Sequence, residues 1–317
     1  MLIDLSALTP LTKLLFDIQL APVQGHRFQP TGFPDLGAAT YETETGTSLL
    51  VESAQSMANR MESACWDEAT QALAPELAGL SYVRVNDKAG KFLTSSVLEA
   101  HRLNSVYVEN ADGGKFHKML GEEIGYADTK PVDRPAFLRT VLRYDVGSLL
   151  HGLFLESIGG RLRFARAMSA FIEADGVRVA ASGGVKNDHV MPGKDGEKTS
   201  AKGYGNVPFH RDEFTAQSIT LFANVDLVQI RGYGLGPEAT KMLTLLALFK
   251  LRGLIDGKLR LRTACDLAVM AETVKATNGG FVLPSRADLA AELRPTISAC
   301  SPMFAKDNGV TTVTYAS

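Results

Sequence analysis

A polar hinge between a short apolar strand and an amphipathic helix is the first place in this sequence that is suited to binding chemistry. The strand at Leu49 runs into Ser53-Ala54-Gln55-Ser56, and the helix after it has apolar side chains at three- and four-residue steps: Ala54, Met57, Ala58, Met61 and Cys65. Ser53 stands at the N-cap position. The polar residues Gln55, Ser56, Asn59 and Arg60 follow, close to the helix end that carries free N–H groups and partial positive charge. The hinge is therefore able to hold a phosphate, and an ordinary capped core helix is the alternative.

Three further segments combine cations with aromatic or flexible residues. Arg27, Phe28 and Gln29 form a cation and ring pair in a loop made rigid by Pro30. Arg161-Leu162-Arg163-Phe164-Ala165-Arg166 interleaves arginines with a ring, an arrangement that grips phosphates while the ring meets a base. The glycine-rich loop from Gly183 to Pro208 carries Lys186 and Lys202 and is followed by Arg211. Each segment has a structural alternative, such as an edge strand or a solvated loop.

No catalytic constellation accompanies these segments. The six histidines are scattered, and no metal-binding pair, nucleophile elbow or nucleotide loop is recognisable. Cys65, Cys265 and Cys300 show neither a disulfide framework nor zinc-ligand spacing. We therefore expect no cofactor and no bound metal.

Composition indicates a folded protein whose charge is unevenly distributed. The 317 residues are 45% hydrophobic and 21% charged, with a net charge of −2. Residues 1–80 hold three Lys/Arg against ten Asp/Glu, whereas residues 161–211 hold nine against five. A free-standing, strongly basic nucleic-acid binder is disfavoured, but a local basic groove is not. No secretory signal or membrane span is recognisable, so we expect a cytoplasmic protein without a membrane partner.

Hydrophobic patterning predicts an α+β domain. Strands are expected at 14–23, at Leu49, around 171–181 as a pair turning at Asp175-Gly176, at 218–230 and at 258–269. Helices are expected from Ser53 and from Pro237 to Gly253, and a hairpin at 82–92. This order is that of a ferredoxin-like or RRM-like fold with long insertions. We predict a single domain over 1–317, with an insertion at 82–136 and an extended loop or hairpin at 183–214.

Two early passages, Gly25 to Gly37 (GHRFQPTGFPDLG) and Val51 to Glu62 (VESAQSMANRME), are similar to the backbone RAMP subunit of type I-G CRISPR effector complexes, formerly type I-U. Ser148 to Gly152 and Ser182 to Asp188 fit the same family. Ser53-Ala54-Gln55-Ser56 resembles the Ser-x-Gln-Ser element that opens the first helix in backbone subunits of other type I complexes. There it implies contact with the CRISPR RNA (crRNA).

The resemblance implies a modified RRM-like (RAMP) palm, in which 82–136 is a finger and 183–214 a thumb. It implies copies that stack head to tail into a filament along the crRNA, beside other CRISPR effector subunits, and present the guide for pairing with target DNA. Such a subunit is not an enzyme. The residues we expect to contact RNA are Arg27, Phe28, Gln29, Ser53, Gln55, Ser56, Asn59, Arg60, Arg161, Arg163, Arg166, Lys186, Lys202 and Arg211.

Two other functions stay open at this point. Backbone subunits of related type III complexes cut target RNA with a loop aspartate and a metal ion, and Asp35 and Asp188 are the loop carboxylates that would serve. A lone loop carboxylate more often caps a turn. A small-molecule enzyme built on the turn at Gly232 to Gly236 lacks an acid, base or nucleophile to support it.

Overall fold

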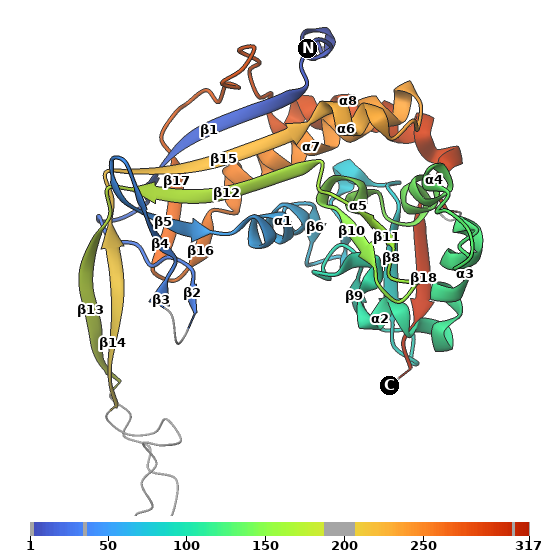
Figure 1. The fold of residues 1–317 in the computed structure, drawn as a ribbon, viewed down its shortest axis with the longest axis horizontal. Helices are drawn as coiled ribbons and strands as arrows, with labels where there is room; N and C mark the ends of the chain where they lie inside the picture. The colour runs from blue at the N-terminus through green and yellow to red at the C-terminus, as the bar shows by residue number, and fades with distance from the viewer. Residues whose placement is uncertain (1–2, 34–36, 187–206, 306–307, 317) are drawn as a thin grey trace, which may run out of the picture.

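A seven-stranded antiparallel sheet forms the centre of the computed structural model (Figure 1), which describes residues 3–33, 37–186, 207–305 and 308–316. The helices are α1 (Ala54–Ser63), α2 (Val106–Glu109), α3 (Lys115–Ile124), α4 (Arg134–Tyr144), α5 (Val146–His151), α6 (Leu227–Gly232), α7 (Pro237–Gly257) and α8 (Arg286–Cys300). The strands are β1 (Lys13–Pro22), β2 (Gly32–Phe33), β3 (Gly37–Ala38), β4 (Thr40–Thr43), β5 (Gly46–Glu52), β6 (Trp66–Asp67), β7 (Ala72–Leu73), β8 (Tyr82–Asn86), β9 (Phe92–Ser95), β10 (Leu153–Leu155), β11 (Leu162–Phe164), β12 (Met168–Asp175), β13 (Arg178–Lys186), β14 (Val207–Thr215), β15 (Ser218–Asp226), β16 (Arg260–Arg262), β17 (Cys265–Val269) and β18 (Val310–Thr314).

Alternating side chains give the central sheet one buried face. Along β1 the apolar Leu14, Phe16, Ile18 and Leu20 are at most 3% exposed, while Asp17 on the opposite face is exposed. The strand order is β16-β17-β1-β15-β12-β5-β4. The helices and the antiparallel sheet confirm the mixed α and β content predicted from hydrophobic patterning, while the ferredoxin-like order stays a prediction.

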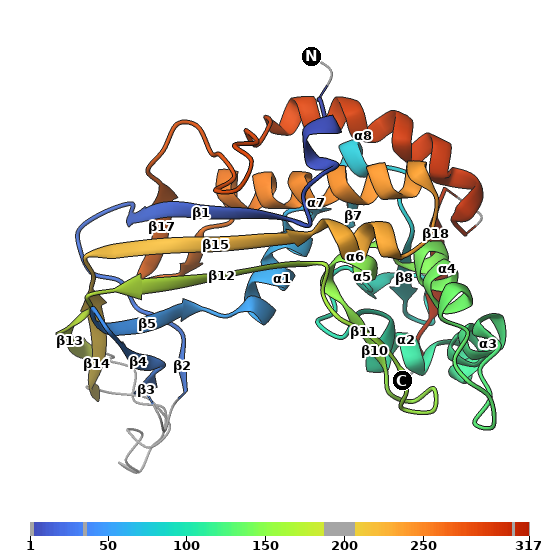
Figure 2. The same ribbon diagram turned by 45° about the horizontal axis from the view of Figure 1, so that its top comes forward.

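Helices α1 and α7 cover the buried face, and α8 packs against α7 (Figure 2). Because α7 is enclosed by the sheet on one side and by helices on the other, it is apolar nearly all round, as the sequence predicts. Its Leu245, Leu246 and Phe249 are at most 1% exposed. Burying a side chain of this kind contributes about 1.5–3 kcal/mol. None of the helices in the described ranges is long and apolar enough to cross a membrane.

A second lobe and a projecting hairpin complete the molecule. The lobe contains α2 to α5, the hairpin β10–β11 and a three-stranded sheet of order β18-β8-β9. It lies at the right of Figure 1, whereas the hairpin β13–β14 extends down from the central sheet at the left. The region 82–136 thus lies in the lobe, and the described parts of 183–214 lie in the hairpin.

Several predicted elements are confirmed and four are wrong. The single strand expected at 258–269 is instead the antiparallel pair β16 and β17. The strand at 14–23, the helix from Ser53 and the 82–92 hairpin are present as β1, α1 and β8–β9. The expected strand pair at 171–181 is wrong, because β12 pairs with β15 and β5 while β13 pairs with β14. The strand from Ser218 ends at Asp226, whose side chain caps α6 by accepting from the backbone N–H of Gln229.

The predicted helix end at Gly253 is also wrong. Helix α7 continues to Gly257, and Gly253 is buried inside it. A Cβ at Gly253 would lie 3.2 Å from the Ala64 Cβ atom just after α1, so the glycine allows the two helices to approach. Its role is packing rather than termination.

Candidate nucleic-acid interface

Two arginines share the buried carboxylate of Glu52 at the end of β5. Arg262 Nη2 lies 2.6 Å and Arg60 Nη2 3.4 Å from Glu52 Oε2, and the Glu52 side chain is 4% exposed. Arg262 also donates to the carbonyl oxygen of Gln29 at 2.7 Å, and Arg60 to that of Leu261 at 2.7 Å. The carboxylate therefore orients both guanidinium groups and balances only one of their two charges.

The same arrangement recurs at Glu213 on β14. Arg211 donates through Nε at 2.9 Å to Glu213 Oε1, and Arg27 Nη1 lies 3.4 Å from Glu213 Oε2. The Glu213 side chain is 6% exposed, whereas those of Arg27 and Arg211 are 56% and 39% exposed. A second buried carboxylate thus holds two arginines with their outer faces open to solvent.

The loop at 27–31 joins these two groups. The backbone of Phe28 pairs with Phe214 next to Glu213, and Gln29 N–H donates to Ala264 in the turn after Arg262. With the exposed Arg260 of β16, the group contains five arginines around two carboxylates. We call Arg27, Arg60, Arg211, Arg260 and Arg262 the arginine cluster, and it has an excess of positive charge.

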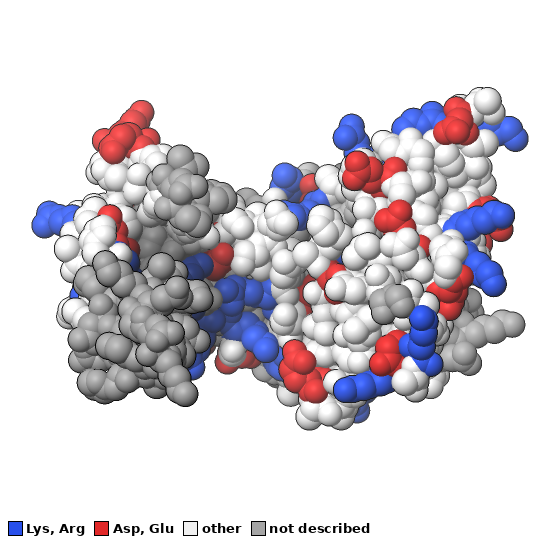
Figure 3. All heavy atoms as spheres, turned by 90° about the horizontal axis from the view of Figure 1, so that it is seen from below, with Lys and Arg blue, Asp and Glu red and all other residues white. Residues whose placement is uncertain are grey.

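The arginine cluster borders a hollow in the molecular surface. Seen from below, Lys and Arg side chains gather in the hollow between the two ends of the molecule, under β16 and α1 (Figure 3, compare Figure 1). A concave cationic surface of this kind attracts a polyanion.

The start of α1 adds polar groups beside the cluster. Ser53 accepts from the backbone N–H of Ser56 at 3.3 Å, which confirms the N-cap. Gln55 is exposed and Asn59 half-buried, and within the described residues neither side-chain amide has a partner. Amides and free helix N–H groups bind phosphate and sugar oxygens without reading sequence.

Two of the residues predicted to contact RNA, Phe28 and Arg60, are engaged in contacts within the protein instead. Phe28 is only 1% exposed and belongs to the core, so its ring offers no face to a base, contrary to the cation and ring pair expected there. Arg60 is occupied largely by the carbonyl oxygens of Leu261 and Arg260 and by Glu52. Gln29 contributes its backbone to the loop, through Arg262 and Ala264.

The arginines at 161–166 lie in the other lobe. Arg161 donates to Tyr126 and to the carbonyl oxygens of Ala127 and Asp128, while Arg163 and Arg166 border a groove beside β10 and β11. Phe164, the ring expected to accompany them, points inward and is 8% exposed. The interleaved pattern therefore belongs to a strand with one buried face, and its cations are not part of the arginine cluster.

Three candidates fall outside the described structure, and a fourth is described only in its backbone. Lys202, Asp35 and Asp188 lie beyond the described residues, and only the backbone of Lys186 is described. Within the described ranges, no group of three or more His, Cys, Asp or Glu residues could hold a metal ion.

Arg260, Arg262, Glu52 and Glu213 are the members of the site that the sequence did not identify. Arg260-Leu261-Arg262 has the same alternation of cation and apolar residue as 161–164, so the signal was present. The two glutamates gave no signal. Arg262, which pairs with Glu52, and Arg27, which pairs with Glu213, are each more than a hundred residues away from their glutamate in the sequence.

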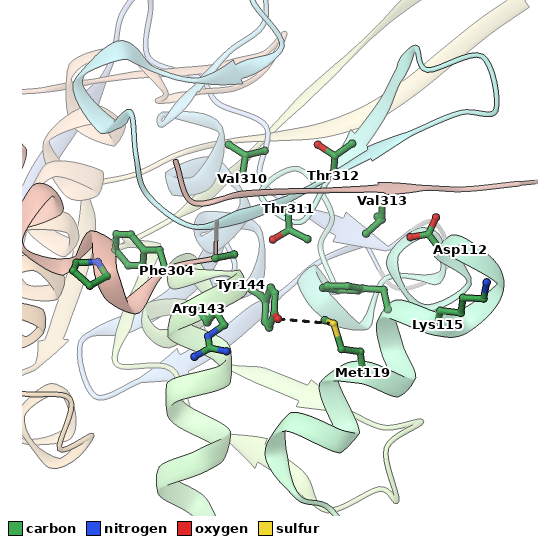
Figure 4. A pocket seen from close by; sticks show the side chains of 13 residues that line it. Asp112, Lys115, Met119, Arg143, Tyr144, Phe304, Val310, Thr311, Thr312 and Val313 are labelled. Carbon is green, nitrogen blue, oxygen red and sulfur yellow. Dashed lines mark hydrogen bonds between the residues drawn. The ribbon is translucent and has the colours of Figure 1, made fainter. Parts of the chain in front are cut away.

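Another groove, of about 1020 Å³, lies between β18 and helices α3 and α4 (Figure 4). Apolar side chains such as Phe304, Val310 and Val313 share it with Asp112, Lys115 and Arg143. Tyr144 donates to Glu123 at 2.6 Å, and burial, then the Glu123 carboxylate, raises the pKa of Tyr144 to about 12. The mixed lining has no convergent charge, so this groove does not compete with the arginine cluster as an anion site.

Solved structures with a similar outline are remote. One chain of "CRISPR RNA-guided surveillance complex, pre-nicking" has a TM-score of 0.40 at 10% identity, over 92% of this chain and 88% of that chain. A chain of "CRISPR RNA-guided surveillance complex" has a TM-score of 0.33 at 14% identity, over 80% and 66%. Csc2 of Thermofilum pendens has a TM-score of 0.31 at 12% identity, over 95% and 80%. The search of curated proteins gave no match.

The sequence profile of the family described as "CRISPR-associated protein GSU0053 (Cas_GSU0053)" matches residues 14–179, more than half of the chain. The match spans both early passages, 25–37 and 51–62, that carry the resemblance to CRISPR subunits. It confirms the CRISPR assignment, while subtype I-G stays a prediction. The chain belongs to the family of CRISPR-associated protein GSU0053.

Proposed function

We propose that this protein is a non-catalytic backbone subunit that holds the crRNA of a type I CRISPR complex and presents it for pairing with target DNA. The observation that carries the proposal is the arginine cluster, placed beside the open N-terminus of α1 in a member of a CRISPR-associated family. Other CRISPR effector subunits are its expected partners.

The chemistry of the cluster suits a sugar-phosphate backbone. Glu52 and Glu213 fix the orientation of their arginines before any ligand arrives, which reduces the entropy lost on binding. Guanidinium groups bind phosphate oxygens through paired N–H donors. In an RNA-guided complex the guide supplies sequence specificity by base pairing, so the protein needs only to hold the backbone.

We infer that the fold serves this role as a ferredoxin-like palm with attached elements. The sheet order β17-β1-β15-β12, with α1 and α7 on one face, supports a palm of this topology. The projecting hairpin β13–β14 is the proposed thumb, and the region 82–136 the proposed finger.

We also infer that copies assemble head to tail along the guide. Residues 1–80 are acidic and residues 161–211 basic, which supports a heterologous contact between one copy and the next. Repetition of such a contact produces a helical filament rather than a closed dimer.

Purification of the full chain from a host that expresses a CRISPR array and the partner subunits tests the proposal. We expect crRNA to co-purify, and Arg27→Ala or Gln55→Ala to reduce its amount per folded protein by several-fold. Arg139→Ala is the matched control, because Arg139 is an exposed arginine of α4 outside the cluster. A chain that emerges monomeric and free of RNA although its partners are present would refute the proposal.

A further inference from the structure

A groove of about 730 Å³ lies beside the hairpin β10–β11, at the start of α4 and next to the turn at 100–104. It is separate from the arginine cluster, since the hairpin β10–β11 lies on one side of α1 and β16 on the other in Figure 1. Four arginines line it, against the single carboxylate of Glu156: Arg102, Arg134, Arg163 and Arg166.

The charges buried behind the groove do not remove this excess. Lys250 Nζ lies 2.6 Å from Glu62 Oε2, and Asp145 is buried beside them. When these three residues are counted with the lining, five cations face three carboxylates. The groove therefore carries uncompensated positive charge in a partly desolvated setting, where charge interactions are strong.

Arg102 lines the groove in a conformation that is unfavourable for stability. Its side chain is 7% exposed, and its Nε and Nη2 atoms have no hydrogen-bond partner among the described residues, with Glu62 Oε1 3.9 Å from Nε. Its φ of 52° lies in the left-handed region, which is unfavourable for an arginine. Unpaired buried donors and local strain are both expected where a binding function has been retained at the expense of stability.

The neighbouring groups repel one another. Burial and then the charge of Arg102 lower the pKa of Arg166, which donates to the His151 carbonyl oxygen at 3.2 Å. Burial, followed by Lys250, Arg102 and Arg166, lowers the pKa of His151 well below its ordinary value. His151 is therefore neutral near pH 7, and an anion in the groove would relieve the repulsion among the remaining cations.

An exposed ring completes the groove. Phe154 is 42% exposed and lies directly opposite Arg163 on the paired strands β10 and β11. Within the described residues, Arg163 and Arg134 have neither a hydrogen-bond nor an ion-pair partner. A cation and an open aromatic face thus stand side by side on the same surface.

We propose that this groove is a second anion site, which binds the phosphate of a nucleotide between Arg163 and Arg166 while its base stacks on Phe154. Arg134 lies at the rim of the groove. The buried Arg102 does not contact the nucleotide, and its positive charge attracts the phosphate from behind the groove surface. The nucleotide is either one unit of a single-stranded nucleic acid or a free mononucleotide, which share the phosphate that the groove recognises. The site does not depend on the crRNA role of the arginine cluster.

Binding of two probes to the full chain tests the proposal: a single-stranded RNA oligonucleotide, followed by fluorescence anisotropy, and uridine monophosphate, followed by calorimetry. The variants are Arg163→Gln, Arg166→Gln and Phe154→Leu, with Arg139→Gln as the matched control. Arg260→Gln reports separately on the arginine cluster. For whichever of the two probes binds in the groove, we expect Arg166→Gln to weaken binding about tenfold, which corresponds to the loss of one charge-assisted hydrogen bond. Ultraviolet cross-linking with peptide mapping should place the base on Phe154.

The results of these measurements distinguish a nucleic-acid strand from a free mononucleotide as the ligand of the groove. RNA binding weakened by Arg163→Gln, Arg166→Gln and Phe154→Leu, with a cross-link at Phe154, supports a nucleic-acid strand. Weakened binding of uridine monophosphate alone supports a free nucleotide. If Arg163→Gln and Arg166→Gln bind both probes as tightly as Arg139→Gln does, the groove is no phosphate site and the proposal is overturned, whatever the result for Arg260→Gln.

Discussion

Lys250 of α7 donates to Glu62 of α1 across 2.6 Å, and the two side chains are 2% and 5% exposed. Each charge was taken from water to form this pair, so each depends on the other. Together they join the two helices that cover the buried face of the central sheet.

Lys250→Met should therefore destabilise the protein by about 3–5 kcal/mol, because it leaves Glu62 charged and buried without its main partner. The free energy of unfolding from urea titration measures this. Lys241→Met on the same helix is the control, since Lys241 is 44% exposed and lies 3.6 Å from Glu292. Its cost should stay below about 1 kcal/mol. Equal losses in the two variants would contradict a structural role for the buried pair.

Asp145, buried next to this pair, should make stability depend on pH. Burial and then the Glu62 charge raise the pKa of Asp145 from 3.8 to about 6, although its carboxylate accepts a hydrogen bond from Ser148. Between these two pKa values the folded state binds more protons than the unfolded state, so stability falls as the pH rises through this window.

Asp145→Asn removes this titration and keeps an acceptor for Ser148. The free energy of unfolding of the variant, minus that of the unmodified protein, should increase by roughly 1–3 kcal/mol between pH 4 and pH 8. Chemical denaturation at a series of pH values measures the difference. A difference between the two proteins that does not change with pH would show that Asp145 has an ordinary pKa.

Gly253→Val should destabilise the protein by about 1–3 kcal/mol through overpacking. A Cβ there would lie 3.2 Å from the Ala64 Cβ and 2.8 Å from Arg286 Nη1, and only the arginine can move aside easily. At Gly257, the last residue of α7, a Cβ would meet nothing within 4 Å, so Gly257→Ala serves as the control and should cost nothing. Thermal denaturation compares the two, and a tolerated valine would mean that α1 and α7 can separate.

The sequence predicted local features well and pairings between distant segments poorly. The period of β1, the N-cap at Ser53 and the apolar α7 depend on neighbouring residues, and all are confirmed. Gly253 was misread because a helix-ending glycine and a glycine at a helix contact look alike without the partner helix.

The site was predicted in part for the same reason. The hinge at Ser53 and the Arg27 loop are local motifs, and the structure brings them near each other. Glu52 and Glu213 hold the arginines of the site in place by ion pairs. The sequence does not indicate these pairs, because only folding brings each carboxylate near its distant arginine. Phe28 and Phe164 were expected to meet bases, but strand alternation and loop packing bury both rings.

Two arginines of the cluster should respond differently to replacement. Arg60→Gln loses its 2.7 Å bond to the Leu261 carbonyl oxygen, so it should cost about 1–3 kcal/mol of stability. Since its guanidinium group is occupied by protein acceptors, crRNA retention per folded protein should be unchanged. Arg260→Gln replaces an exposed side chain and should alter stability by less than about 0.5 kcal/mol.

Arg260→Gln should instead weaken the hold on the guide, because the exposed Arg260 side chain has no hydrogen-bond or ion-pair partner among residues 3–33, 37–186, 207–305 and 308–316 and can meet a phosphate. Dissociation of crRNA from the purified complex at increasing salt measures this. The slope of log affinity against log salt should fall by roughly 0.7 for each phosphate of the single-stranded RNA that the variant no longer neutralises. Arg139→Gln provides the baseline. A slope that changes in Arg60→Gln but not in Arg260→Gln would reverse the assignment, and Arg60 would then be the residue that faces the guide.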